Sequence, residues 1–89
     1  MQVTIPPPQY DHAFPGIVIE RILPLEEVRK LCQQIGVGYV DGCAGFVTLD
    51  SGEKACFIVL PVDGFDSVAA YRRHEVSHCN GWPASHRDE

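Results

Sequence analysis

The 89-residue sequence lacks any long hydrophobic run. Its longest apolar stretch, CFIVLPV, is far shorter than the roughly 20 residues that a membrane-spanning helix needs, so we expect no membrane segment. The start, MQVTIPPPQYDHAFPG, has no basic residues followed by an apolar run, which is the pattern of a secretory signal. These two absences predict a cytoplasmic protein that does not engage a membrane.

Clustered positive charge is also scarce. The formal net charge is -5, and Arg72 and Arg73 form the one basic pair. A nucleic-acid binder normally carries a basic face that displaces counterions from phosphates, so we expect no nucleic-acid partner. An acidic balance suits a site for a divalent cation, although it is common in small proteins of many kinds.

Closely spaced cysteines are missing too. The four cysteines are Cys32, Cys43, Cys56 and Cys79, and none of them forms the Cys-x-x-Cys pair of a zinc knuckle. Without a secretory signal, they are expected to remain thiols in a small core. A Cys43–Cys56 disulfide is the alternative, but a DSGE turn centred between residues 51 and 52 would leave Cys43 about four positions out of register with Cys56.

The patterns in the first half of the chain predict an arm, a strand and a helix. Residues 1–15 are rich in proline, which favours an extended arm on the surface or against its neighbours. GIVIERIL alternates weakly and predicts a strand. LEEVRKLCQQIG, which follows Pro24, has apolar residues at helical spacing and predicts a helix that ends at Gly36 or Gly38.

The second half predicts a β-hairpin and a second helix. GFVTLD and KACFIVLP flank a turn, and the second strand is apolar on both faces, so it should be central or covered. A helix through SVAAYRRHEVSHCN would be capped by Asp66 or Ser67 and stopped by Gly81 and Pro83. We therefore predict one α+β domain over residues 1–89, with a small sheet of a hairpin plus one further strand packed on two helices.

The second predicted helix carries the pentapeptide HEVSH. His74 and His78 are four residues apart, so both imidazoles lie on one helix face, where they can bind one tetrahedral zinc ion. Glu75 is not a ligand in this pattern. It is placed to take a proton from the zinc-bound water during attack on a carbonyl and to pass it to the leaving amine.

A third ligand is expected, because catalytic zinc commonly has three protein ligands and an open position for water. His86 is the candidate, since Gly81 permits a turn that could bring it back toward the helix. His12 in the arm is an alternative if the arm folds over the helix, and Asp88 and Glu89 are further alternatives.

Several neighbours of the motif have a structural interpretation first. Trp82, just after a helix end, is expected to pack on the core, although it could line a pocket. Cys79 turns about 100° away from His78 and is expected to be a small buried side chain. An oxyanion donor would help hydrolysis, but the sequence positions none of the tyrosines, Tyr10, Tyr39 and Tyr71, for that role.

These residues resemble the motif of the zincin metallopeptidases. HEVSHCNG is similar to the metzincin pattern His-Glu-x-x-His-x-x-Gly-x-x-His, except that position 84 is Ala84 and the histidine comes at 86. The chain is also similar to short zincin-like proteins of bacteria and phages that carry HCNGWP followed by a histidine. The resemblance covers residues 16–86 and implies a minimal zincin core, in which one strand of the hairpin at residues 45–60 would bind substrate backbone.

Two classes of function follow. The first is a zinc-dependent peptidase with one ion on His74, His78 and His86, Glu75 as general base, and a peptide or protein substrate. The second is a module in which the same histidines hold a metal that stabilises a small core without turnover, alone or in a larger assembly. A closed four-ligand site would favour the second class, and an open position would favour the first.

Overall fold

The fold is a three-stranded mixed sheet with two helices, in a computed structural model that describes residues 3–86. In chain order the elements are β1 (Val18–Leu23), α1 (Leu25–Gln34), β2 (Cys43–Thr48), β3 (Lys54–Pro61) and α2 (Val68–Cys79). The predicted α+β class, with a hairpin plus one further strand and two helices, is confirmed.

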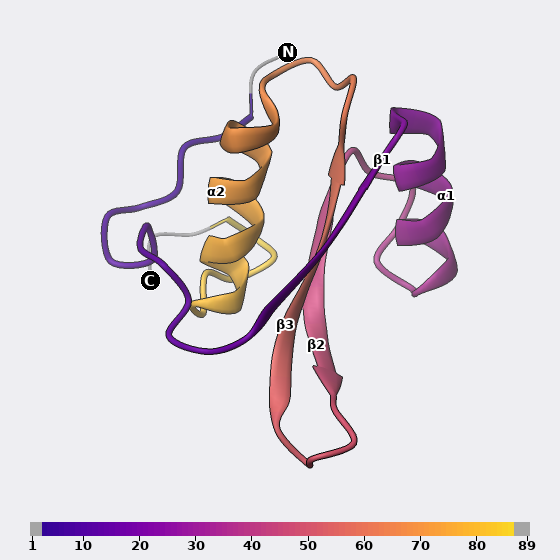
Figure 1. The fold of residues 1–89 in the computed structure, drawn as a ribbon. Coiled ribbons are helices and arrows are strands. Elements are labelled where there is room, and N and C mark those ends of the chain that lie inside the picture. Colours follow the sequence, from indigo (N-terminus) through magenta and orange to yellow (C-terminus); the bar gives the residue numbers. More distant parts are fainter. Residues whose placement is uncertain (1–2, 87–89) are drawn as a thin grey trace.

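Strand β3 lies at the centre of the sheet, whose order is β1-β3-β2. It pairs in parallel with β1 and antiparallel with β2. The two helices lie on opposite sides of the sheet (Figure 1), so β3 is covered on both faces, as its uninterrupted apolar sequence predicted.

The alternation of side chains along β3 divides the core into two halves. Cys56, Ile58 and Leu60 point to one face and pack with Tyr71 and Cys79 of α2. The intervening side chain of Val59 points to the other face, where its cluster partners are Val28, Cys32 and Cys43. Each helix is therefore held by its own small apolar cluster.

The turn predicted between residues 51 and 52 would place Val47 opposite Cys56. The observed register of the hairpin differs from this by one residue. Val47 pairs with Ala55 and not with Cys56, which pairs with Phe46. The turn is a three-residue loop at residues 50–52, closed by a hydrogen bond from Leu49 N to Glu53 O of 2.8 Å. Gly52, at φ +89°, supplies the left-handed residue that such loops need at their last position.

The expectation of free thiols is wrong, because the cysteines form two disulfides. Cys32 of α1 bonds to Cys43 of β2, and Cys56 of β3 bonds to Cys79 of α2. The Cys43–Cys56 alternative is also ruled out, since Cys43 lies opposite Val59 in the ladder and faces the other side of the sheet. Sequence spacing could not show these pairs, because each depends on how a helix docks on the sheet.

The termini of α2 follow their sequence signals. Ser67, rather than Asp66, is the N-cap, and its side chain accepts a hydrogen bond of 3.1 Å from Ala70 N. The chain leaves the helix at Gly81 with φ +106°. Neither helix in the described part of the chain has the length and apolar character needed to cross a bilayer.

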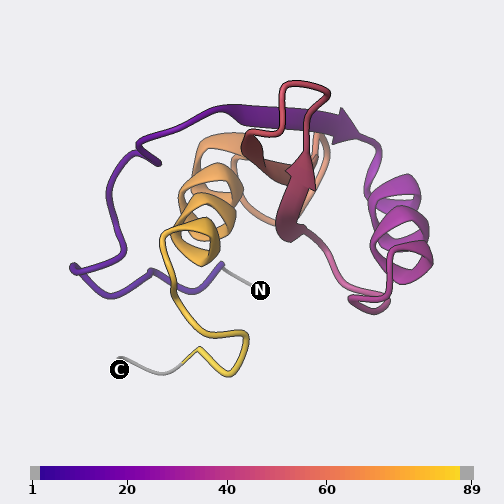
Figure 2. The ribbon, with the colours of Figure 1, turned by 90° about the horizontal axis from the view of Figure 1, so that it is seen from below.

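The amino-terminal arm curves around the outside of α2 (Figure 2). Asp11 forms an ion pair with Arg73 in the middle of the helix. At the carboxyl end, Asn80 Nδ2 donates to the carbonyl oxygens of Tyr10 and His12 at 2.9 and 2.6 Å. The arm thus runs along the helix that carries HEVSH.

Replacement of each cysteine pair by serine tests what the disulfides do. Both double variants, C32S/C43S and C56S/C79S, should lose about 2–4 kcal/mol of unfolding free energy in denaturant melts. Only C56S/C79S should also weaken zinc binding, because Cys79 adjoins His78 and its bond fixes α2 to the sheet. Equal zinc affinities in the two variants would contradict this role.

Candidate metal centre

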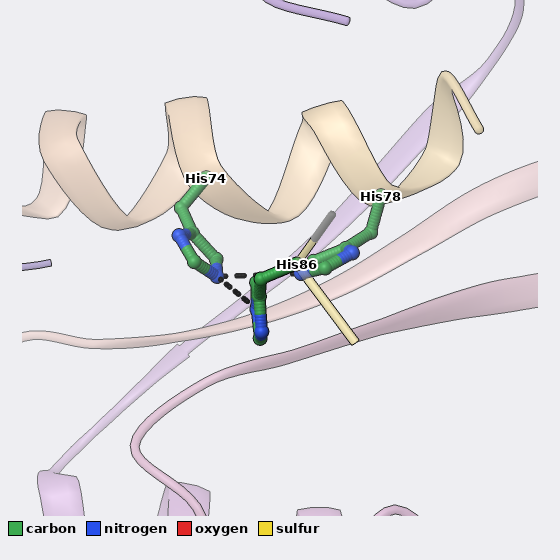
Figure 3. A group of neighbouring side chains, drawn as sticks. All are labelled: His74, His78 and His86. Atoms are coloured by element: carbon green, nitrogen blue, oxygen red, sulfur yellow. Dashed lines mark hydrogen bonds between the residues drawn. The ribbon is translucent and has the colours of Figure 1, made fainter. Parts of the chain in front are cut away.

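Three histidine side chains converge beside α2. His74 and His78 project from the helix and His86 comes from the following loop (Figure 3). Their ligand nitrogens all lie within 4.8 Å of one another. The structure thus brings together the three residues that the sequence singled out.

Two of the three nitrogen separations have the length found at a tetrahedral ion, and the third lies within 4.8 Å. The Nε2 atom of His74 lies 3.3 Å from the Nε2 atoms of His78 and of His86. Zinc–imidazole bonds of about 2.0–2.1 Å at tetrahedral angles place ligand nitrogens about 3.3–3.4 Å apart. The spacing therefore matches the donor set that zinc prefers.

The outer nitrogens of the two helical histidines are occupied by backbone carbonyls. His74 Nδ1 donates to Thr4 O at 2.8 Å, and His78 Nδ1 donates to Trp82 O at 2.8 Å. A carbonyl can only accept, so the proton of each neutral ring is on Nδ1 and each Nε2 presents a lone pair. Metal-binding histidines are usually oriented in this way.

This tautomer leaves two lone pairs facing each other across 3.3 Å, between His74 and His78. Neither Nε2 has a proton to donate while both rings are neutral, so the contact is repulsive unless a cation lies between them. Burial lowers the pKa of both imidazoles and so favours the neutral form. The chemistry of the donor set therefore fits a bound metal ion.

His86 reaches the cluster through a tight turn after α2. Its backbone N–H donates to Pro83 O at 2.8 Å, and its φ of +61° is unusual for a residue other than glycine. Among the described residues, no other histidine, cysteine or carboxylate joins this group. His12 instead contacts Ala13 O at 3.0 Å, and Asp88 and Glu89 lie outside the described residues.

Trp82 packs against the histidines as well as being buried. Its ring stacks on His78 with centroids 4.8 Å apart and an interplanar angle of 12°, and only 3% of the residue is exposed. Its carbonyl also holds His78. The expected structural role is confirmed, and the tryptophan forms one wall of the metal centre.

Glu75 is a mostly buried acidic residue of α2. It is 5% exposed and makes no hydrogen bond or ion pair with any described residue. Burial raises the pKa of its carboxyl to about 8. Gly42 permits this position, because a Cβ there would lie 2.9 Å from Glu75 Oε2 and 3.3 Å from Val59 O.

A cleft of about 810 Å³ contains the histidines and Glu75. One wall is α2 and the other is β2 with the preceding loop, and the start of the arm at Val3 and Thr4 also lines it. Strand β2 is an edge of the sheet. The metal centre thus opens onto a strand whose outer edge has no neighbour in the described sheet.

The other candidate side chains take different positions. Tyr71 lines the cleft but is 5% exposed, and its hydroxyl accepts from Phe65 N at 3.3 Å. Tyr39 is exposed and bonds to Glu26. Cys79 is in a disulfide and cannot be a ligand. Sequence reasoning missed Thr4 and Gly42, whose roles arise from tertiary contacts that no spacing reveals.

No protein-family model, curated protein or solved structure matches this chain. The metal centre is therefore interpreted from its own residues and their geometry.

Shortening the arm tests the role of the Thr4 carbonyl. Deletion of residues 1–5 removes the acceptor for His74 Nδ1 but keeps the Asp11 and Asn80 anchors. Zinc affinity, measured by competition with a chromophoric chelator, should fall by roughly 10–100-fold. Deletion of residues 1–2 alone is the matched control and should bind zinc as the parent does. The same affinity in both truncations would show that the carbonyl has no such role.

Proposed function

We propose that this protein is a zinc-dependent peptidase. The observation that carries the proposal is the combination of three converging imidazoles with a glutamate in one cleft beside an edge strand. A metal held only for stability would not require an acidic residue in the same cleft.

The roles of the residues follow from their positions. His74, His78 and His86 would hold the ion, and Thr4 and Trp82 would fix the tautomers of the first two. When bound, zinc lowers the pKa of a coordinated water and polarises the carbonyl of the peptide. With the ion held there, Glu75 in its ionised form would take a proton from water and give it to the leaving amine.

Strand β2 offers a place for the substrate backbone. Its outer edge faces the cleft, and an extended peptide can add to such an edge through main-chain hydrogen bonds. Gly42, which immediately precedes β2, lies against Glu75. A peptide paired with β2 would therefore pass the carboxyl that acts on its scissile bond.

The alternative is a metal-stabilised module without turnover. A structural zinc site is ordinarily closed by four protein ligands. The described residues supply three, which is the usual ligand number of a catalytic zinc site, and this favours hydrolysis. Small size is the feature that favours the alternative, although the two disulfides already stabilise the core.

The disulfides also bear on where the protein acts. Disulfides persist in oxidising compartments and are rare in the cytoplasm, where thiols are kept reduced. The cytoplasmic location was predicted from the absence of a membrane-spanning run and of a secretory signal pattern. With Cys32–Cys43 and Cys56–Cys79 both formed, we favour an oxidising compartment.

Zinc content and hydrolysis, measured on the parent and on Glu75→Gln, test the proposal. The parent should bind one zinc per chain and cleave a peptide library, with fragments identified by mass spectrometry. Glu75→Gln should keep the metal and lose at least about 100-fold in rate, because the amide cannot accept the proton. Hydrolysis by the variant at the parental rate, or none by the zinc-loaded parent, would refute the peptidase.

A further inference from the structure

Two exposed valines lie in the loop that leads into β2. Val37 and Val40 are 53% and 39% exposed and line the cleft. Large apolar side chains left open beside a polar site are typical of ligand contacts, because burying them in a complex is favourable.

The order of the chain indicates where the valines lie relative to the reacting groups. Gly42 adjoins Glu75, and farther along, Cys79 Sγ is 3.8 Å from Gly45 O, so β2 and α2 run in the same direction along the cleft. Val40 lies two residues before Gly42, and Tyr71 lies one helical turn before Glu75. Both therefore come before the point where Gly42 meets Glu75. These residues, Val37, Val40 and Tyr71, form what we call the apolar end of the cleft.

Apart from the histidines that would hold the metal, the cleft offers no cationic side chain among the described residues. Those that line it include the acidic residues Asp41 and Glu75, and none is lysine or arginine. Arg29 forms an ion pair with Asp41 at 2.9 Å, so the positive charge of Arg29 is already paired. An acidic substrate side chain would be desolvated at the apolar end without a cation to receive it.

We propose that the cleft selects peptides with a bulky apolar side chain next to the scissile bond, seated on Val37 and Val40, and rejects acidic side chains there. This inference rests on the proposed peptidase function. A peptide paired with β2 places alternate side chains on the two sides of its backbone, so one such side chain near Glu75 reaches the apolar end.

A randomised decapeptide library, offered to the zinc-loaded parent and to zinc-loaded Glu75→Gln, tests the substrate class. The parent should cleave beside Leu, Phe or Met at least about tenfold more often than beside Asp or Glu. Glu75→Gln should bind, without cleaving them, peptides enriched in the same apolar residues. Equal use of apolar and acidic residues in both assays would overturn the subsite.

Val40→Lys supplies the sharper test, with Val62→Lys as its control. Val62 is 60% exposed and does not line the cleft. The first variant should lower the preference for Leu over Glu by about tenfold, because it places a cation at the apolar end, and the control should leave it unchanged. An unchanged preference in Val40→Lys would refute the assignment.

The two proposals fail in different ways. Cleavage without an apolar preference overturns the subsite and leaves the peptidase standing. Apolar-selective binding by Glu75→Gln without cleavage by the parent overturns the peptidase and leaves the subsite standing. Neither binding nor cleavage overturns both.

Discussion

The burial of β3 on both faces is the constraint on which the rest of this structure depends. A chain of 89 residues has little apolar material, and here it must cover two faces of one strand. Each face receives one helix, one small apolar cluster and one disulfide. The Cys56–Cys79 bond joins the centre of the sheet to the last residue of α2, next to His78, so it fixes the helix that carries His74, Glu75 and His78 to the core.

The metal centre is an extension of that core toward β2. Trp82 stacks on His78, and the Thr4 carbonyl of the arm accepts a hydrogen bond from His74. Gly42 leaves room for the carboxyl of Glu75. These contacts come from three separate segments of the chain. Together they turn the Nε2 lone pairs of His74 and His78 toward each other, an arrangement that is unfavourable in the absence of a cation.

The sequence predicted the elements well because their signals are local. Helical spacing, the Ser67 cap and the Gly81 exit define α2, and the (i, i+4) rule alone put His74 and His78 together. For His86, the sequence indicated only that the chain after the helix could bring it back toward the other two histidines. The disulfide pairs, the parallel pairing of β1 and the one-residue shift of the hairpin were beyond sequence reasoning. The first two depend on docking between distant segments, and the third depends on whether the turn closes over two residues or three.

Zinc K-edge X-ray absorption on the zinc-loaded protein tests the central claim, an open three-histidine site, most directly. The account predicts three imidazole nitrogens and one oxygen donor that exchanges with solvent or an added anion, because the described residues provide three ligands and an adjacent base. Four protein ligands, or a spectrum unchanged in His86→Ala, would contradict it. The first result would assign the metal to structure, and the second would remove the loop histidine from the centre.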